Sequence, residues 1–219
     1  MFTGIVQGLG HVKRAERRGG DLRLEVYSED LDWADVTLGD SIATNGVCLT
    51  AVAFAEKSYV ADVSVETLSH TTLAHWHMGH RVNLELALTP KSRLGGHFVS
   101  GHVDGVGEIL ERHADARSER MRLRAPAELS RYIAHKGSIT VDGVSLTVNC
   151  VAGAEFELNI VPHTMASTIM SDYRVGTKVN LEVDLLARYI ERLLSSSAGD
   201  SADSALTESF LAEHGYMRR

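Results

Sequence analysis

Short segments in which hydrophobic and polar residues alternate recur along the chain, as in residues 23–27 and 81–86. Strict alternation over such lengths is typical of strands that turn one face to a core and the other to solvent. The pairs Asn45-Gly46 and Asp142-Gly143 stand between apolar runs. They predict β-hairpins, because a type I′ turn needs a positive φ at both central residues. The pattern therefore predicts a protein made mainly of short strands and tight turns.

Two other segments show helical spacing. Residues 126–133 begin with Pro126 and bring their apolar residues to one face, which predicts a short helix. A wider apolar stripe is made of Leu185, Leu186, Tyr189, Ile190, Leu193 and Leu194. A stripe that wide needs a partner, and we expect another copy of the chain, with packing on the chain's own core as the alternative. We expect a flexible linker over 195–201 and a short docked helix over 206–216.

The second half of the chain repeats the first at a constant offset of 97 residues. The matching blocks are 4–10 with 101–107, 41–50 with 138–147, 67–71 with 164–168, and 79–86 with 176–183. Because four blocks keep one register without a gap, we infer two homologous domains. Each has many short strands and about ninety residues, which predicts an all-β chain of two small Greek-key barrels. We place the first domain at 1–97, with 90–97 as its joining segment, the second at 98–184, and a tail at 185–219.

Composition narrows the class of protein. The net charge of −7 gives no general attraction for phosphate backbones, so we expect no nucleic-acid partner. A secreted disulfide scaffold would carry more than the two cysteines Cys48 and Cys150. No apolar run approaches the length of a membrane span, and the first eight residues lack the features of a signal peptide. We therefore expect a cytoplasmic protein with no membrane partner.

Several segments resemble the riboflavin synthase family. They are Met1–Val6, Asn45–Thr50, Gly95–Gly105, Asp142–Thr147 and Leu185–Tyr189, with Ser209–Leu211 late in the tail. The resemblance covers nearly the whole chain. This combination of motifs is specific to that family and to its non-catalytic relatives.

The resemblance implies two six-stranded barrels and a C-terminal helix that builds a homotrimer. It implies one substrate molecule in each barrel, with the active site where the N-terminal barrel of one subunit faces the C-terminal barrel of another. The implied reaction is a dismutation of two 6,7-dimethyl-8-ribityllumazine molecules. A four-carbon unit passes between them, giving riboflavin and 5-amino-6-(ribitylamino)uracil, and no metal or cofactor takes part.

A duplicated domain suits a reaction between two copies of one molecule, because two similar pockets can hold them face to face. The difficult steps are removal of a proton from the C7 methyl of one lumazine and addition at C7 of the other. Positioning, proton transfer and hydrogen bonds to the ring edge are what the protein must supply. Positions where the two repeats differ in polar chemistry are therefore the first candidates for distinct roles.

Cys48 is such a position, because its counterpart in the second repeat is Ser145. The resemblance makes Cys48 a candidate nucleophile or acid–base group, whereas a lone cysteine is more commonly a small buried hydrophobe. Ser41 is matched by Ser138. Its hydroxyl could hydrogen-bond the substrate or position Cys48, or only satisfy the edge of a strand.

Two histidines complete the candidate catalytic group. His102 is the counterpart of Ile5, and His97 lies in the joining segment. Histidine exchanges protons near neutral pH, which makes it suitable for general acid–base work. The resemblance places both in the active site, with His102 the better candidate for proton transfer. Structural histidines with satisfied hydrogen bonds are the alternative.

The resemblance also implies a set of substrate-binding residues. They are Gly4, Ile5, Val6, Cys48, Leu49, Thr50, Asp62, Val63, Ser64, Val65, Glu66, Thr67, Gly101, His102, Val103, Lys136, Ser145, Leu146, Thr147, Val161, Pro162, His163, Thr164 and Asp184. Thr67 and Thr164 would bond ribityl hydroxyls, or else cap helices. Lys136, which we compare with Asp40 of the first repeat, would reach a ligand across the subunit boundary, or is a surface lysine. Asp184 at the start of the tail helix would contact the ribityl chain.

Two patterns are similar to a dinucleotide-binding motif and to a metal site, but both are incomplete. Gly8-Leu9-Gly10 has no third glycine and no following helix, so it is not a dinucleotide-binding motif. His75, His77 and His80 lie close in sequence, but no cysteine or acid completes a metal site and the second repeat has no equivalent. We interpret them as a surface turn.

The main rival function is a non-catalytic protein that holds a lumazine or flavin as a light-emitting antenna. Such a binder needs one pocket and no proton-transfer groups. The presence of Ser41, Cys48, His97, His102 and Lys136 together favours the enzyme. A flavin-dependent reductase would need a nicotinamide-binding domain for which the chain has no room. A purely structural trimer would not explain the polar differences between the repeats.

Overall fold

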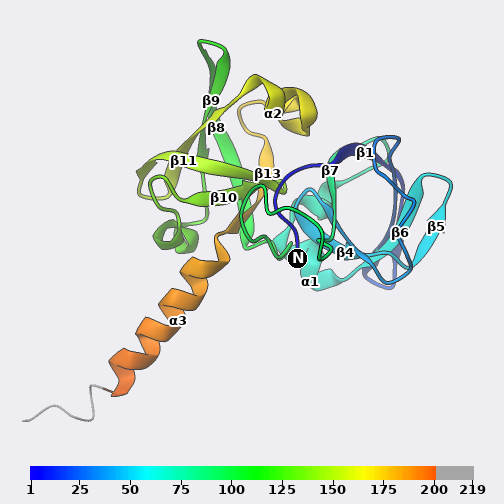
Figure 1. The fold of residues 1–219 in the computed structure, drawn as a ribbon, viewed down its shortest axis with the longest axis horizontal. Helices are drawn as coiled ribbons and strands as arrows, with labels where there is room; N and C mark the ends of the chain where they lie inside the picture. The colour runs from blue at the N-terminus through cyan, green and yellow to red at the C-terminus, as the bar shows by residue number, and fades with distance from the viewer. Residues whose placement is uncertain (201–219) are drawn as a thin grey trace, which may run out of the picture. The chain divides into compact units, whose positions relative to one another are not determined.

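A computed structural model describes residues 1–200 of the chain, and their side chains as far as residue 195 (Figure 1). Residues 1–185 form one compact unit, and helix α3 continues beyond it. The first repeat contains β1 (Gly8–Arg18), β2 (Asp21–Tyr27), β3 (Ser41–Thr44), β4 (Val47–Thr50), β5 (Ala53–Ala55), β6 (Ser58–Val63), α1 (Val65–His70), the 3₁₀ helix η1 (Thr72–His75) and β7 (Arg81–Leu86).

The second repeat follows the same order. Its elements are β8 (Gly105–Asp115), β9 (Ser118–Arg124), the 3₁₀ helix η2 (Ala127–Tyr132), β10 (Ser138–Val141), β11 (Val144–Ala152), β12 (Glu155–Ile160), α2 (Pro162–Ser167), the 3₁₀ helix η3 (Ile169–Asp172) and β13 (Lys178–Val183), before α3 (Leu185–Asp200). Seven elements of each repeat begin and end 97 residues apart: β1 and β8, β2 and β9, β3 and β10, β6 and β12, α1 and α2, η1 and η3, and β7 and β13. The predicted duplication is confirmed.

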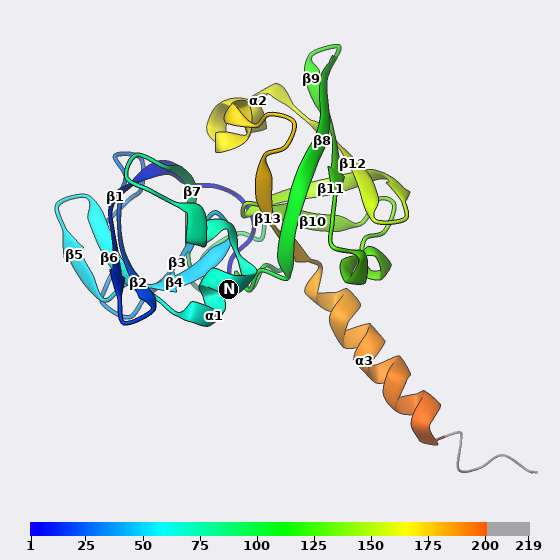
Figure 2. The ribbon, with the colours of Figure 1, turned by 180° about the vertical axis from the view of Figure 1, so that it is seen from behind.

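The two repeats differ in how their sheets close. In the second repeat six strands form a closed barrel in the order β10-β11-β12-β9-β8-β13 (Figure 2). Strand β9 lies beside β12 rather than β10, which is the return connection of a Greek key. The long strand β11 closes the barrel, because it pairs with β10 at one end and with β12 at the other.

In the first repeat the stretch that corresponds to β11 is split into β4 and β5. The sheet is therefore a seven-stranded half-barrel with β4 and β5 at its edges, where we expected a closed six-stranded barrel. The interruption falls where the chain changes its pairing from β3 to β6. Two backbone hydrogen bonds remain there, from Ala51 to Asp40 at 2.9 Å and from Val52 to Val60 at 2.8 Å.

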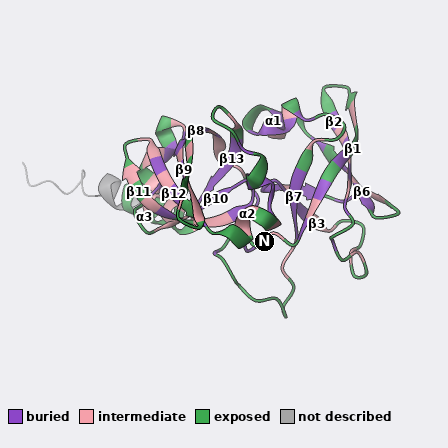
Figure 3. Ribbon diagram, turned by 90° about the horizontal axis from the view of Figure 1, so that it is seen from above, coloured by how far each residue is buried: buried purple, intermediate pink, exposed green. Residues whose placement is uncertain are grey.

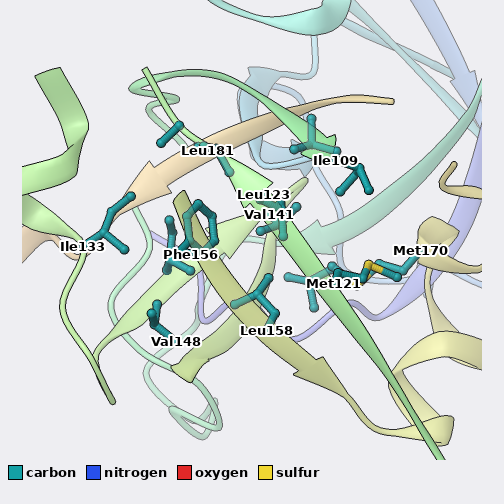
Figure 4. Close-up of a cluster of buried hydrophobic side chains, with 14 of the residues drawn as sticks. Ile109, Met121, Leu123, Ile133, Val141, Val148, Phe156, Leu158, Met170 and Leu181 are labelled. Atoms are coloured by element: carbon teal, nitrogen blue, oxygen red, sulfur yellow. The ribbon is translucent and has the colours of Figure 1, made fainter. Parts of the chain in front are cut away.

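Each repeat has its own hydrophobic core, formed by the inward residues of its strands (Figure 3). The core of the second repeat packs Phe156 and Leu158 of β12 against Met121 and Leu123 of β9 (Figure 4). The segments that precede β1 and β8, residues 1–7 and 98–104, are called the leading segments here. Each contributes to the hydrophobic core of the other repeat. Val6 packs on the core of the second repeat, and Val103 packs on that of the first. The two repeats therefore exchange their leading segments.

The hairpin turns confirm the sequence prediction. Asn45-Gly46 and Asp142-Gly143 have positive φ at both residues and join β3 to β4 and β10 to β11. The short helix at 126–133 is present as η2, a 3₁₀ helix with Pro126 at its N-cap.

We expected a flexible linker to begin at Ser195. This prediction is wrong over residues 195–200, because α3 continues to Asp200. Within this helix the Ser195 hydroxyl donates to the Glu191 carbonyl at 2.9 Å. The helix expected at 206–216 lies outside the described residues. Within the described residues, no helix is long and apolar enough to cross a membrane.

Candidate active site

The exchanged leading segments meet equivalent strands of the opposite repeats. The backbone N–H of Cys48 on β4 donates to the Gly101 carbonyl at 2.8 Å. The backbone N–H of Ser145 on β11 donates to the Gly4 carbonyl at 2.7 Å. Each contact is the other's counterpart at the offset of 97. Cys48 with Gly101 and Ser145 with Gly4 therefore form two similar places, each built from both repeats.

Two buried glutamates hold these leading segments. Glu85 on β7 accepts from the Thr3 N–H at 2.6 Å, from the Thr3 hydroxyl at 2.7 Å and from the Gly4 N–H at 3.0 Å. Glu182 on β13 accepts the corresponding three bonds, from the Ser100 N–H and hydroxyl, both at 2.7 Å, and from the Gly101 N–H at 2.9 Å. Burial raises the pKa of both carboxyls, while these hydrogen bonds oppose the rise.

Sequence reasoning did not assign these glutamates to the site. The two repeats share a glutamate at the same place, but it stands at a polar position of an alternating strand, and alternation predicts that such a position faces solvent. A charged residue there needs local hydrogen-bond donors, and the leading segments supply them.

Glycine is required where each leading segment touches the opposite strand. Gly4 and Gly101 have φ of +74° and +78°, a region that favours glycine. A Cβ on Gly4 would lie 2.6 Å from the Cβ of Ser145, and one on Gly101 would lie 2.7 Å from the Cβ of Cys48. The close approach of backbone to side chain thus depends on the absence of a side chain.

The β3–β4 hairpin presents Cys48 on the face opposite the core. Register pairs Ser41 with Thr50 and Ala43 with Cys48, so these four residues share that face. Cys48 is half-buried and packs against a small cluster that includes Phe2. Leu49, by contrast, is buried in the core, so only its backbone can reach a ligand on the Cys48 face.

At the second place Ser145 is joined to His97. The Nδ1 of His97 and the Oγ of Ser145 lie 2.7 Å apart in a hydrogen bond. His97 is buried, and its Nε2 has no hydrogen-bond partner among the described residues. Burial lowers its pKa, and the nearby charge of Asp184 acts in the opposite direction. Sequence reasoning assigned His97 and Ser145 to the site without pairing them, since the two are 48 residues apart in the chain.

His102 and its counterpart Ile5 occupy equivalent exposed positions. The backbone N–H of His102 donates to the Ser100 hydroxyl at 3.2 Å, and that of Ile5 to the Thr3 hydroxyl at 3.1 Å. Both side chains therefore follow directly on the glycine that touches the opposite strand. His102 thus stands next to the Gly101–Cys48 contact, whereas His97 contacts Ser145.

The predicted segments 62–67 and 161–164 lie where β6 and β12 lead into α1 and α2. Most of their residues are exposed or half-buried, but Val63 lies in the core. Ser64 caps α1 by accepting from the Thr67 N–H at 3.3 Å, and Val161 precedes α2 without a side-chain cap. Neither Thr67 nor Thr164 is a helix cap, which removes the alternative role considered for them.

Lys136 corresponds to Gly39 rather than to Asp40. The Lys136 N–H donates to Val148 at 2.8 Å, as the Gly39 N–H donates to Ala51 at 2.9 Å, and both residues have positive φ. The comparison with Asp40 is wrong by one residue. Lys136 is exposed, and Leu146, Thr147 and Asp184 range from half-buried to exposed.

The histidines of the surface turn pack on one another and on Trp76. Among the described residues, no group of three or more His, Cys, Asp or Glu side chains could hold a metal ion. His80 stacks on Trp76 with ring centroids 5.2 Å apart, and His77 meets His80 edge to face at 5.8 Å.

A comparison with known protein families finds the same duplication. The model of the lumazine binding domain matches the chain twice, over residues 3–87 and 100–184. Among solved structures, a crystal structure of LumP complexed with riboflavin superposes with a TM-score of 0.78 at 24% identity, covering 84% of this chain and 99% of that one. At this identity the likeness concerns the fold.

Curated relatives match over almost their whole length. Riboflavin synthase of Photobacterium phosphoreum is 49% identical over 217 residues, which is 99% of this chain and 100% of the relative. Riboflavin synthase of Mycobacterium tuberculosis strain H37Rv is 47% identical over 202 residues, 90% of this chain and 100% of the relative. That of Bacillus subtilis is 38% identical over 216 residues, 99% of this chain and 100% of the relative. The two matched domains and the full-length identity together show that the chain belongs to the riboflavin synthase family.

Proposed function

We propose that the chain catalyses the reaction of its family, the dismutation of two 6,7-dimethyl-8-ribityllumazine molecules into riboflavin and 5-amino-6-(ribitylamino)uracil, in half-sites built from both repeats. The observation that carries this proposal is the reciprocal contact of the leading segments, Gly101 on Cys48 and Gly4 on Ser145. These contacts form two similar places with different polar groups, which we call the Cys48 half-site and the Ser145 half-site. Such a pair suits a reaction in which two copies of one molecule act as donor and acceptor.

The Ser145 half-site is suited to remove a proton. Because burial lowers the pKa of His97, its imidazole is neutral at neutral pH and can accept a proton. The hydrogen bond between His97 Nδ1 and Ser145 Oγ provides a path to the serine oxygen. We therefore assign proton removal to this pair.

The Cys48 half-site offers different groups. Cys48 presents a thiol on the outer face of the β3–β4 hairpin, and His102 follows the glycine that touches it. We assign to Cys48 the role of nucleophile or acid–base group, with His102 as its proton-transfer partner and Ser41 on the same face. Substrate contacts by 62–67, 161–164, Lys136 and Asp184 are proposed from family resemblance.

We further propose that the half-sites of different subunits face each other in a homotrimer assembled through α3. Five large apolar side chains of α3 are more than half exposed in the single chain: Leu186, Tyr189, Ile190, Leu193 and Leu194. Covering them removes apolar area from water, which favours association. The trimer and a cytoplasmic location stay predictions.

The decisive test is to incubate the purified full chain with 6,7-dimethyl-8-ribityllumazine alone and to follow riboflavin by its absorbance. We expect one riboflavin for two lumazine molecules consumed, without any added cofactor, and no conversion in a blank without protein. Tight binding of the lumazine with no riboflavin formed would contradict the enzyme and identify a non-catalytic binder instead.

A further inference from the structure

A cavity lies between the two repeats, and its lining includes none of the predicted site residues. Its volume is about 470 Å³. Every residue that lines it has its counterpart from the other repeat in the lining as well. The buried floor consists of three such pairs: Asn45 and Asp142, Thr72 and Ile169, and Trp76 and Tyr173. The cavity therefore lies on the pseudo-twofold axis that relates the repeats.

The two halves of the floor differ in their hydrogen bonds. On the second repeat, the Tyr173 hydroxyl donates to Asp142 Oδ2 at 2.5 Å. On the first, Trp76 Nε1 donates to Thr72 Oγ1 at 3.2 Å and does not engage Asn45.

The floor also holds a hydrogen-bond donor that no described protein group uses. Asn45 is 2% exposed, and its Oδ1 accepts from the Asn83 N–H at 2.7 Å. Its Nδ2 donates to no acceptor among the described residues. Asn45 Nδ2 is not among the fully buried polar atoms that lack a partner, so it is accessible from the cavity, where the carbonyl oxygen of a ligand can accept its hydrogen.

An aromatic wall stands beside this donor. The Trp76 indole lies nearly parallel to the His80 ring, with 18° between the ring planes. On the other half of the floor, Ile169 and Tyr173 are the counterparts of Thr72 and Trp76. Flat rings pack well on such side chains, and the volume is in the range of small-molecule sites.

The charges at the mouth of the cavity are matched. Arg81 of the first repeat pairs with Asp172 of the second, and Lys178 pairs with Glu108 at 2.9 Å. An ionic ligand would have to compete with these pairs, so the mouth gives no advantage to either sign of charge.

We propose that this cavity binds an uncharged, flat heteroaromatic molecule whose ring carbonyl accepts a hydrogen bond from Asn45 Nδ2 while its ring packs on Trp76. The site is separate from both half-sites and does not depend on the assignment of their roles. Trp76 is also a built-in reporter, because the chain has only one other tryptophan, Trp33.

The test uses the full chain with Trp33→Phe, so that Trp76 alone supplies indole fluorescence. The probe is lumichrome, a flat ring system with carbonyl groups and no sugar chain. We expect saturable quenching of the Trp76 emission with one lumichrome bound per chain. Absence of saturable quenching would overturn the proposal.

Three further variants locate the binding. Ile169→Phe fills the cavity from its floor and should abolish the quenching, whereas Val175→Phe adds a ring at an exposed position outside the lining and should leave it unchanged. Asn45→Asp keeps the acceptor for Asn83 but loses the free donor, and Asp142 shows that Asp fits this turn. We expect it to raise the dissociation constant about tenfold.

The control results separate this site from the active site. Circular dichroism confirms that each variant is folded, and lumazine turnover is measured in parallel. Undiminished quenching in both Ile169→Phe and Asn45→Asp would place the probe elsewhere and refute the cavity site, whatever the turnover shows.

Discussion

Cys48 and Ser145 occupy the same position in the two repeats, but their surroundings are not equivalent. Ser145 has His97 as a hydrogen-bond partner. Beside Cys48, the residue that follows the touching glycine is the exposed His102, whereas beside Ser145 it is Ile5. The duplication thus keeps the backbone of the site and changes the side chains to which we assign proton exchange.

This difference predicts how single substitutions affect the reaction. Cys48→Ser and His102→Gln should reduce kcat by about a hundredfold or more, as expected for a lost acid–base or nucleophilic group, with a smaller effect on lumazine binding. Steady-state turnover and a lumazine fluorescence titration measure the two quantities. Cys150→Ser is the control, since Cys150 is exposed and outside the site. Equal losses in turnover and binding would mean that Cys48 and His102 only shape the pocket.

At the level of elements, the leading segments connect the two repeats at the candidate site. Each is held to its own repeat by a buried glutamate, Glu85 or Glu182, and ends on a strand of the other repeat. A shift of one leading segment therefore displaces the residue after its glycine relative to Cys48 or Ser145.

Gly101→Ala tests this coupling. The new Cβ would lie 2.7 Å from the Cβ of Cys48, and the backbone would keep its φ of +78°. Gly79→Ala is a matched control, because Gly79 has φ of +87° but nothing within 4 Å of an added Cβ. Both variants should lose about 1 kcal/mol of stability from the positive φ. We expect Gly101→Ala to lose a further 1–3 kcal/mol or so by overpacking, together with most of its turnover, as measured by urea unfolding and the lumazine assay. Similar losses in the two variants would show that the contact with Cys48 has no special role.

The sequence predicts elements better than contacts. Strand alternation, the two hairpin turns and the offset of 97 are local or periodic signals, and the structure confirms them. The break between β4 and β5 could not be predicted from alternation, since it depends on how the strand changes partners. Likewise, the pairing of His97 with Ser145 arises only after the leading segments have exchanged, which no pattern along the chain encodes.

Helix α3 carries the prediction about assembly. Its exposed apolar residues have no role in the strand pairing of either repeat. Removal of residues 185–219 should therefore yield monomers with little activity, because the half-sites of different subunits would no longer be brought together. Analytical ultracentrifugation and the lumazine assay measure the two effects. A truncated protein that remained trimeric would contradict the assignment of assembly to the tail.

Across the whole molecule, the two repeats are joined by a reciprocal buried network. Asn83 donates from Nδ2 to the Asp142 carbonyl at 2.9 Å, and Asn180 donates from Nδ2 to the Asn45 carbonyl at 2.9 Å. The turns also touch, since a Cβ on Gly46 would lie 2.7 Å from the backbone nitrogen of Gly143. The network departs from its symmetry at one ionisable group, Asp142, which stands where the first repeat has the neutral Asn45.

Burial raises the pKa of Asp142 from 3.8 to about 7, against the opposing effect of the hydrogen bond from Tyr173. The folded protein therefore binds the proton more tightly than the unfolded chain. This contribution to stability is fully present below about pH 4 and is lost as the pH rises to about 7. Its slope is at most about 1.4 kcal/mol per pH unit.

Asp142→Asn should remove this titration, and the presence of Asn45 at the equivalent turn indicates that an amide fits. The unfolding free energy of the variant relative to the parent should therefore increase between pH 5 and pH 7 and level off above. Urea unfolding at a fixed protein concentration measures this difference, with the exposed Asp35→Asn as control. Because the carboxyls of Glu85 and Glu182 titrate in both proteins, subtracting the two curves leaves the contribution of Asp142. Parallel curves for variant and parent would mean that Asp142 is ionised in the folded protein across this range, and that the network joining the two repeats tolerates a buried charge at its centre.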